Sequence, residues 1–240
     1  MAQAVAGTRP KRSLPYPLAL YQTAVGKKYV MAITGIMWMG YVLSHMAGNL
    51  KIYMGAEDLN HYGEWLRTLA TPFVPRTVFL WILRGGLIAA FALHVHSAYS
   101  LTRMNWAKDK KYSGERDFIA ASFASRTMRW TGLIVLLFLA WHLADLTWGI
   151  EPIHPDYIRG DVYHNMIQSL ERPPVAIFYI VANLALGVHL MHGVWSLFQS
   201  MGWNHPKLNP LRRWIAYGFT AIVIGGNLTF PVAIMTGIVE

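Results

Sequence analysis

Six of the ten histidines in this chain lie inside long apolar segments, where an ionisable side chain is costly to bury. Four successive segments carry them: His45 in the first, His94 and His96 in the second, His142 in the third, and His189 and His192 in the fourth. A single buried histidine is more often a hydrogen-bonded contact between helices than a ligand. Four segments that each carry one favour a shared role, and paired imidazoles are suitable axial ligands for haem iron.

The segments that hold these histidines are long enough to cross a membrane. Of 240 residues, 54% are hydrophobic and only 14% are charged, against about a quarter in soluble domains. A crossing needs roughly 20 apolar residues, and helix is the form that satisfies its own backbone in lipid. The sequence therefore predicts an all-α integral membrane bundle of five transmembrane helices, at Tyr29–Leu50, Thr77–Leu101, Trp130–Ile150, Val175–Met201 and Trp214–Val239.

The lysines and arginines predict the orientation of this bundle. Fifteen of those outside the helices lie in the N-terminal arm and in the second and fourth loops, whereas five lie in the other two loops. This bias is the positive-inside pattern, so the net charge of +9 indicates membrane topology rather than nucleic-acid binding. We expect a cytoplasmic arm at residues 1–27, a transmembrane domain at 28–240 without a convincing repeat, and the C-terminus outside.

The loops carry few signals of structure. Residues 56–69 are compatible with a short surface helix. The dipeptides Thr71-Pro72 and Val74-Pro75 would end it, because a residue before proline is disfavoured in a helix. Residues 102–128 read as a polar cytoplasmic loop, and residues 151–173 as an acidic outer loop. Pro173 and Pro174 mark the start of the fourth membrane helix.

Depth in the membrane sorts the histidines into two layers. The first and third helices run outward, and His45 and His142 lie in their later halves. The second and fourth helices run inward. His94 lies nine residues before Arg103, roughly 13 Å from the inner end, and His189 is also on the inner side. Two layers of two histidines predict two stacked haems that form a path for electrons.

The neighbours of these histidines are small, which favours room for a flat macrocycle. Ala90 and Ala98 flank His94, Ala185 and Gly193 flank His189, and Gly48 follows His45. Small residues also favour ordinary helix packing in membranes. Spacing does not choose between His94 and His96. The chain has no cysteine, which excludes thiolate ligands and cysteine-held iron–sulfur clusters.

Several sequence fragments together resemble a known family across residues 29–238. They are Met31-Ala32-Ile33-Thr34-Gly35 with Ser44-His45-Met46-Ala47-Gly48-Asn49, Leu93-His94-Val95-His96-Ser97-Ala98, Arg129-Trp130-Thr131-Gly132 with Ala140-Trp141-His142, and Phe178-Tyr179-Ile180-Val181 with His189 and His192-Gly193-Val194-Trp195-Ser196. In this order they resemble the dihaem cytochrome b membrane anchor of succinate:menaquinone oxidoreductases and fumarate reductases, with loops similar to those of actinobacterial members.

This resemblance implies specific ligands and partners. The family pairs His94 with His189 near the cytoplasm and His45 with His142 near the outside, and it selects His94 over His96. It implies two b-type haems, menaquinone as substrate, and a bacterial cell membrane. The flavoprotein with FAD and the iron–sulfur subunit would dock on the cytoplasmic face, so this chain would belong to an enzyme without holding the dicarboxylate site.

Other polar residues near the membrane ends are secondary candidates. Some relatives use a glutamate near the outer end at a menaquinone site, and Glu64 is its nearest match by position. We expect it to carry protons for the quinone, with a pKa raised by partial burial; a solvated surface carboxylate is the alternative. Asp145 fits two roles equally well: it could transfer protons, or it could cap the helix at the membrane boundary. Possible contacts to haem propionates, or supporting contacts, come from Arg84, Arg103, Arg129 and His192.

Two other functions fit parts of the pattern. The cytochrome b subunit of another quinone-linked dehydrogenase, such as a hydrogenase, would receive electrons at the outer face, which the basic inner face disfavours. A haem-free proton-coupled transporter would use histidine and aspartate as a relay, but broken helices or repeats are typical of that class. A reduced-minus-oxidised visible spectrum separates haem proteins from transporters.

The charge bias makes a prediction about topology. A periplasmic reporter fused after Glu240 should be active, and the same reporter inserted at residues 108–111 should be silent, because the more basic loops stay inside. Activity in the reverse pattern would exchange the inner and outer histidine layers.

Overall fold

The computed structural model describes residues 15–109, 119–203, 205–207 and 209–240, and its regular elements are helices. In chain order they are α1 (Tyr16–Gln22), α2 (Ala24–Asn49), the 3₁₀ helix η1 (Leu50–Met54), α3 (Ala56–Thr68), α4 (Val78–Asp109), α5 (Ile119–Leu143), the π-helix η2 (Ala144–Trp148), α6 (Val162–Leu170), α7 (Pro173–Ser200) and α8 (Asn209–Met235).

Five helices among the described residues are long and apolar enough to cross a membrane: α2 with η1, then α4, α5 with η2, α7 and α8. This confirms the all-α fold class and the five expected segments. The Trp81, Trp130 and Trp148 side chains are more than half exposed, as expected for side chains that face lipid. Some helices extend past the apolar windows, as α4 does to Asp109, because backbone hydrogen bonding continues past the apolar stretch. In contrast, α8 ends at Met235, before its window does.

The segments between the membrane helices agree with the expectation in two places and differ from it in two. The expected surface helix is present as α3, and the two prolines at 173 and 174 begin α7. Part of the expected loop at 102–128 is helical, since α4 runs to Asp109 and α5 begins at Ile119. The expected loop at 151–173 contains α6, whose first turn is capped by the Asp161 carboxylate, which accepts from the His164 N–H at 2.9 Å.

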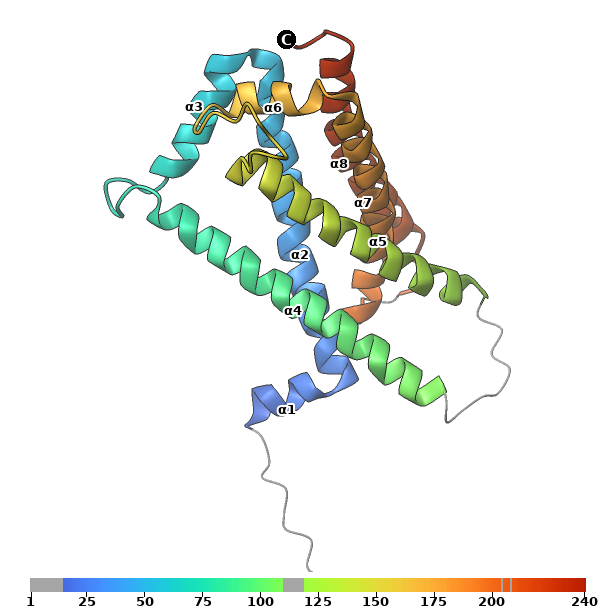
Figure 1. Ribbon diagram of the computed structural model, residues 1–240. Coiled ribbons are helices and arrows are strands. Elements are labelled where there is room, and N and C mark those ends of the chain that lie inside the picture. Colours follow the sequence, from blue (N-terminus) through green and yellow to red (C-terminus); the bar gives the residue numbers. More distant parts are fainter. Residues whose placement is uncertain (1–14, 110–118, 204, 208) are drawn as a thin grey trace, which may run out of the picture.

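The bundle has two distinct ends. Figure 1 shows α1 at one end, and α3, α6 and the C-terminal end of the chain at the other. We call the first end inner and the second outer, in line with the predicted orientation, which stays a prediction from charge. The closest helix pairs are α2 with α4, α5 with α7, and α7 with α8.

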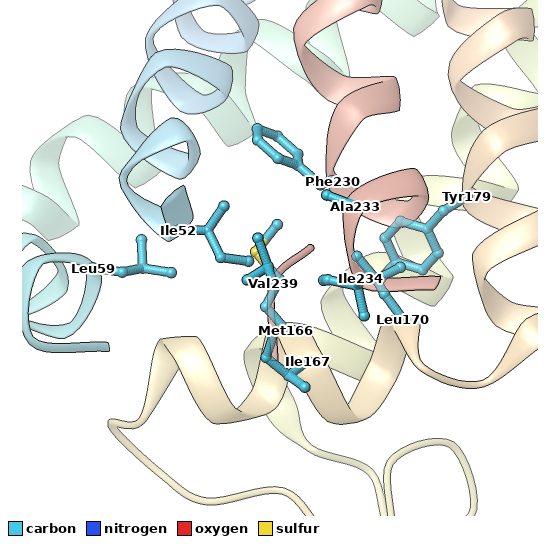
Figure 2. Packing of buried hydrophobic residues seen from close by; sticks show 10 residues of the cluster. All are labelled: Ile52, Leu59, Met166, Ile167, Leu170, Tyr179, Phe230, Ala233, Ile234 and Val239. Carbon is cyan, nitrogen blue, oxygen red and sulfur yellow. The ribbon is translucent and has the colours of Figure 1, made fainter. Parts of the chain in front are cut away.

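A small apolar core fixes α3 and α6 onto the outer end. Its buried side chains come from η1, α3, α6 and the end of α8, and Figure 2 shows them converging: Ile52, Leu59, Met166, Ile167, Leu170, Phe230 and Ile234. The Asn60 amide strengthens this contact because it donates to Asp161 at 2.9 Å and accepts from the Tyr163 N–H at 3.0 Å.

A buried carboxylate organises the segment between α5 and α7. Asp145 is 0% exposed, and its two oxygens accept from four side chains. The donors are His154 at 2.9 Å, Arg172 at 3.2 Å, Ser169 at 2.5 Å and Tyr179 at 2.8 Å. His154 lies in the loop before α6, Ser169 in α6, Arg172 just before α7 and Tyr179 in α7. Asp145 therefore connects the outer loop, α6 and α7 to the end of α5.

Removal of this carboxylate should destabilise the outer end. Asp145→Ala leaves buried donors without an acceptor, a change that costs on the order of 3 kcal/mol in buried ion pairs. We expect a lower midpoint of thermal unfolding in detergent, followed by circular dichroism. Asp156→Ala, an exposed carboxylate in the same loop, is the control. Equal midpoints for the two variants would contradict the role of Asp145.

Candidate functional site

The outer pair of histidines meets across the bundle. His45 on α2 and His142 on α5 have ring centroids 5.8 Å apart, with the ring planes at 86°. Two bonds from one metal ion to imidazole nitrogens, each about 2 Å long, place the ring centres about 6 Å apart. The separation of the two rings therefore fits a single iron held between them.

Aromatic rings surround the outer pair and keep it apolar. The Tyr41 ring stacks on His45 at 5.4 Å, and Phe138 lies 5.7 Å from His142. The Tyr179 hydroxyl is 3.4 Å from Nδ1 of His142 and donates to the buried Asp145 carboxylate. Asp145 is thus linked to a candidate ligand through one tyrosine, which the sequence did not indicate.

The inner pair has a different set of contacts. His94 on α4 places Nδ1 3.1 Å from the Thr34 hydroxyl on α2. His189 on α7 places Nδ1 3.3 Å from the Thr131 hydroxyl on α5. His189 also interacts electrostatically with His94. The structure therefore places His45 beside His142, and the pairing of His94 with His189 stays a prediction.

The helices that carry the outer histidines share a pattern that the reading of the sequence missed. Thr34-Gly35 precedes His45 by eleven residues, and Thr131-Gly132 precedes His142 by eleven residues. A Cβ at either glycine would lie within 4 Å of Cε1 of the facing inner histidine. The sequence showed no convincing repeat, because the threonines acquire meaning only when the partner helix is in place.

The structure changes one expectation about a small residue and gives His96 a contact of its own. Gly48 was expected to leave room for a macrocycle, but a Cβ there would lie 2.5 Å from the Tyr62 ring of α3. This glycine therefore makes room for Tyr62. The exposed His96 forms a hydrogen bond with the Tyr21 hydroxyl of α1, and this contact anchors the short inner helix to α4.

The arginines expected near propionates all lie over aromatic rings. The guanidinium of Arg84 is 5.0 Å from the centre of the Trp81 ring, that of Arg103 is 6.0 Å from Tyr99, and that of Arg129 is 5.7 Å from Trp106. The three side chains are exposed on the outside of the bundle, and these contacts hold them there. His192 is partly buried one turn beyond His189 on α7 and interacts with it electrostatically.

Glu64 differs from the carboxylate expected for proton transfer. It lies on α3, and its carboxylate accepts from Arg76 at 2.6 Å and from Arg67 at 3.3 Å. These partners, Arg76 first, hold the pKa of Glu64 below its ordinary value. We expected partial burial to raise the pKa, and that expectation is wrong, because two guanidinium groups stabilise the ionised form.

Comparison with known proteins gives one match. Residues 114–228 match the family model described as succinate dehydrogenase/fumarate reductase transmembrane subunit. This stretch is just under half of the chain and contains His142 and His189. The comparison with curated proteins gave no match, and neither did the comparison with solved structures. The family match supports the resemblance seen in the sequence: this stretch of the chain is similar to membrane subunits of succinate dehydrogenase and fumarate reductase.

Proposed function

We propose that this chain is the cytochrome b anchor that passes electrons from a succinate dehydrogenase iron–sulfur subunit to menaquinone. The observation that carries the proposal is the separation of 5.8 Å between the His45 and His142 rings, which suits axial ligation of one iron. The inner pair, His94 and His189, would hold a second b-type haem. When bound, the two haems would carry single electrons between the two faces of the membrane.

The protein groups around the proposed ligands suit this task. Paired helices hold each imidazole in a fixed place, and the rings of Tyr41 and Phe138 exclude water from the outer pair. A dry, apolar surround is a principal determinant of the potential of a haem. Hydrogen-bond partners within reach of Nδ1 on three ligands limit rotation of their rings.

The partners follow from the family match. Succinate dehydrogenases and fumarate reductases oxidise or reduce a dicarboxylate, and this cysteine-free membrane chain has no ligands for iron–sulfur clusters. The flavoprotein with FAD and the iron–sulfur subunit would therefore supply the dicarboxylate site and the clusters, docked at the inner, basic face. The chain would act in the cell membrane of a bacterium, with its N-terminus in the cytoplasm.

The assignment of ligands predicts the haem content of variants. Replacing any one of His45, His94, His142 or His189 with alanine should remove one of two haems, so the haem-to-protein ratio should fall by about half. Pyridine haemochrome quantitation of the purified complex measures this ratio. His96→Ala is the matched control, since that side chain contacts Tyr21. Unchanged haem content in His94→Ala would contradict the assignment, and a wild-type complex without haem would favour the transporter.

We also propose that Glu64 contributes to a menaquinone site at the outer end. Because Arg76 and Arg67 lower the pKa of Glu64, its carboxylate is a weak base, and its role would be to accept a hydrogen bond from the quinol hydroxyl. Glu64→Gln keeps the shape and removes the charge that Arg67 and Arg76 share.

This variant should retain both haems and the oxidation of succinate by an artificial dye. It should reduce menaquinone at least about 10-fold more slowly, because a hydrogen bond to a charged group contributes about 1.5–3 kcal/mol and about 1.4 kcal/mol is a factor of 10. Glu57→Gln, an exposed carboxylate in the first turn of the same helix, is the control. Normal menaquinone turnover in Glu64→Gln would place the quinone site elsewhere, with the inner pocket near Arg103 and His192 as the next candidate.

A further inference from the structure

The two threonines that face the inner histidines, Thr34 and Thr131, donate their hydroxyl protons to carbonyls of their own helices. The Thr34 hydroxyl donates to the Val30 carbonyl at 2.7 Å, one turn back on α2. The Thr131 hydroxyl donates in the same way to the Thr127 carbonyl at 2.8 Å on α5. A hydroxyl has one proton and two lone pairs, so each threonine can only accept from the facing imidazole.

This geometry decides which tautomer each inner histidine adopts. The atom that faces the hydroxyl is Nδ1 in both cases, at 3.1 Å for His94 and 3.3 Å for His189. Because the hydroxyl accepts, Nδ1 must carry the proton. The lone pair of the neutral ring then lies on Nε2, which is the atom left for a metal ion.

Each inner histidine has a second contact, with the backbone of the helix that carries its threonine. Met31, three residues before Thr34, contacts the His94 ring through its backbone. Met128, three residues before Thr131, contacts the His189 ring in the same way. The same three-part arrangement therefore occurs twice, between α2 and α4 and again between α5 and α7. Both threonines are buried, at 4% and 9% exposure, so water does not compete for these hydrogen bonds.

Each of these threonines lies eleven residues before an outer candidate ligand, which is about 16 Å along a helix. One helix therefore carries a ligand at one depth and, at the other depth, the acceptor for a ligand on the neighbouring helix. We propose that Thr34 and Thr131 are positioning residues, which hold His94 and His189 in the tautomer that binds iron through Nε2 and strengthen both as ligands. This inference rests on the proposed function.

When a threonine hydroxyl accepts a hydrogen bond from Nδ1–H, the imidazole becomes a more basic ligand. A more basic ligand stabilises ferric over ferrous iron, so loss of either hydroxyl should raise the midpoint potential of the inner haem. The Met31 and Met128 backbone contacts remain in such variants, and the shift is therefore expected without complete loss of the haem. Thr34→Val and Thr131→Val remove the hydroxyl and keep the shape of the side chain.

The experiment is a potentiometric titration of the purified complex, followed in the visible haem bands. The component that is absent in His94→Ala identifies the inner haem. We expect Thr34→Val and Thr131→Val to shift this component to higher potential, the double variant to shift it further, and the outer component to stay in place. Haem affinity should fall about 10-fold or more, the effect typical of removing such a partner.

Two variants serve as controls. Thr34→Ser keeps a hydroxyl and should retain the wild-type potential. Thr229→Val makes the same change at an exposed threonine on α8 whose hydroxyl donates to its own helix, to the Gly226 carbonyl at 2.7 Å. A valine variant could instead lose the inner haem while Thr34→Ser and Thr229→Val retain it. That result also supports the role of Thr34 and Thr131 as positioning residues.

An inner potential that stays at the wild-type value in both valine variants, with both haems bound, overturns the inference and leaves the proposed function intact. A wild-type complex that binds no haem overturns the proposed function itself. If one valine variant does not assemble, the other carries the same test from the opposite helix pair.

Discussion

An imidazole inside an apolar helical bundle needs a partner for each ring nitrogen, because lipid supplies none. This requirement governs the arrangement of the bundle around its histidines. Helices α2 and α4 pack so that Thr34 meets His94, and α5 and α7 pack so that Thr131 meets His189. The nitrogen satisfied on each ring is the one that a bound metal would leave free.

The two ends of the bundle satisfy the same requirement differently. At the inner end, the neutral hydroxyls of Thr34 and Thr131 face Nδ1 of the two imidazoles. At the outer end, His142 meets the Tyr179 hydroxyl, and Tyr179 donates to a fully buried carboxylate, Asp145. The four donors to this carboxylate, one of them the Arg172 guanidinium, compensate for its burial. The outer end is therefore the more polar and the more tightly cross-linked of the two.

The π-helix at Ala144–Trp148 has a structural reason in this setting. A π turn adds a residue to the helix and rotates the side chains that follow it. Here it directs Asp145 toward α6 and α7, whereas His142, three residues earlier, faces His45. Gly149, with a φ of 59°, then ends the helix in the left-handed region, and the chain turns back over the outer end.

The sequence alone determined the helical class, the five crossings, the histidine layers and the short helix α3, because apolar length and the cost of buried ionisable groups are local properties. It did not reveal α6, the role of Thr34 and Thr131, or the surroundings of Asp145 and Glu64. Each of those depends on a side chain from a distant segment: the pKa of Glu64 on Arg76, and the burial of Asp145 on Arg172 and Tyr179. Only the packing of the helices against one another supplies such partners, and so it decides which polar residues act on the histidines.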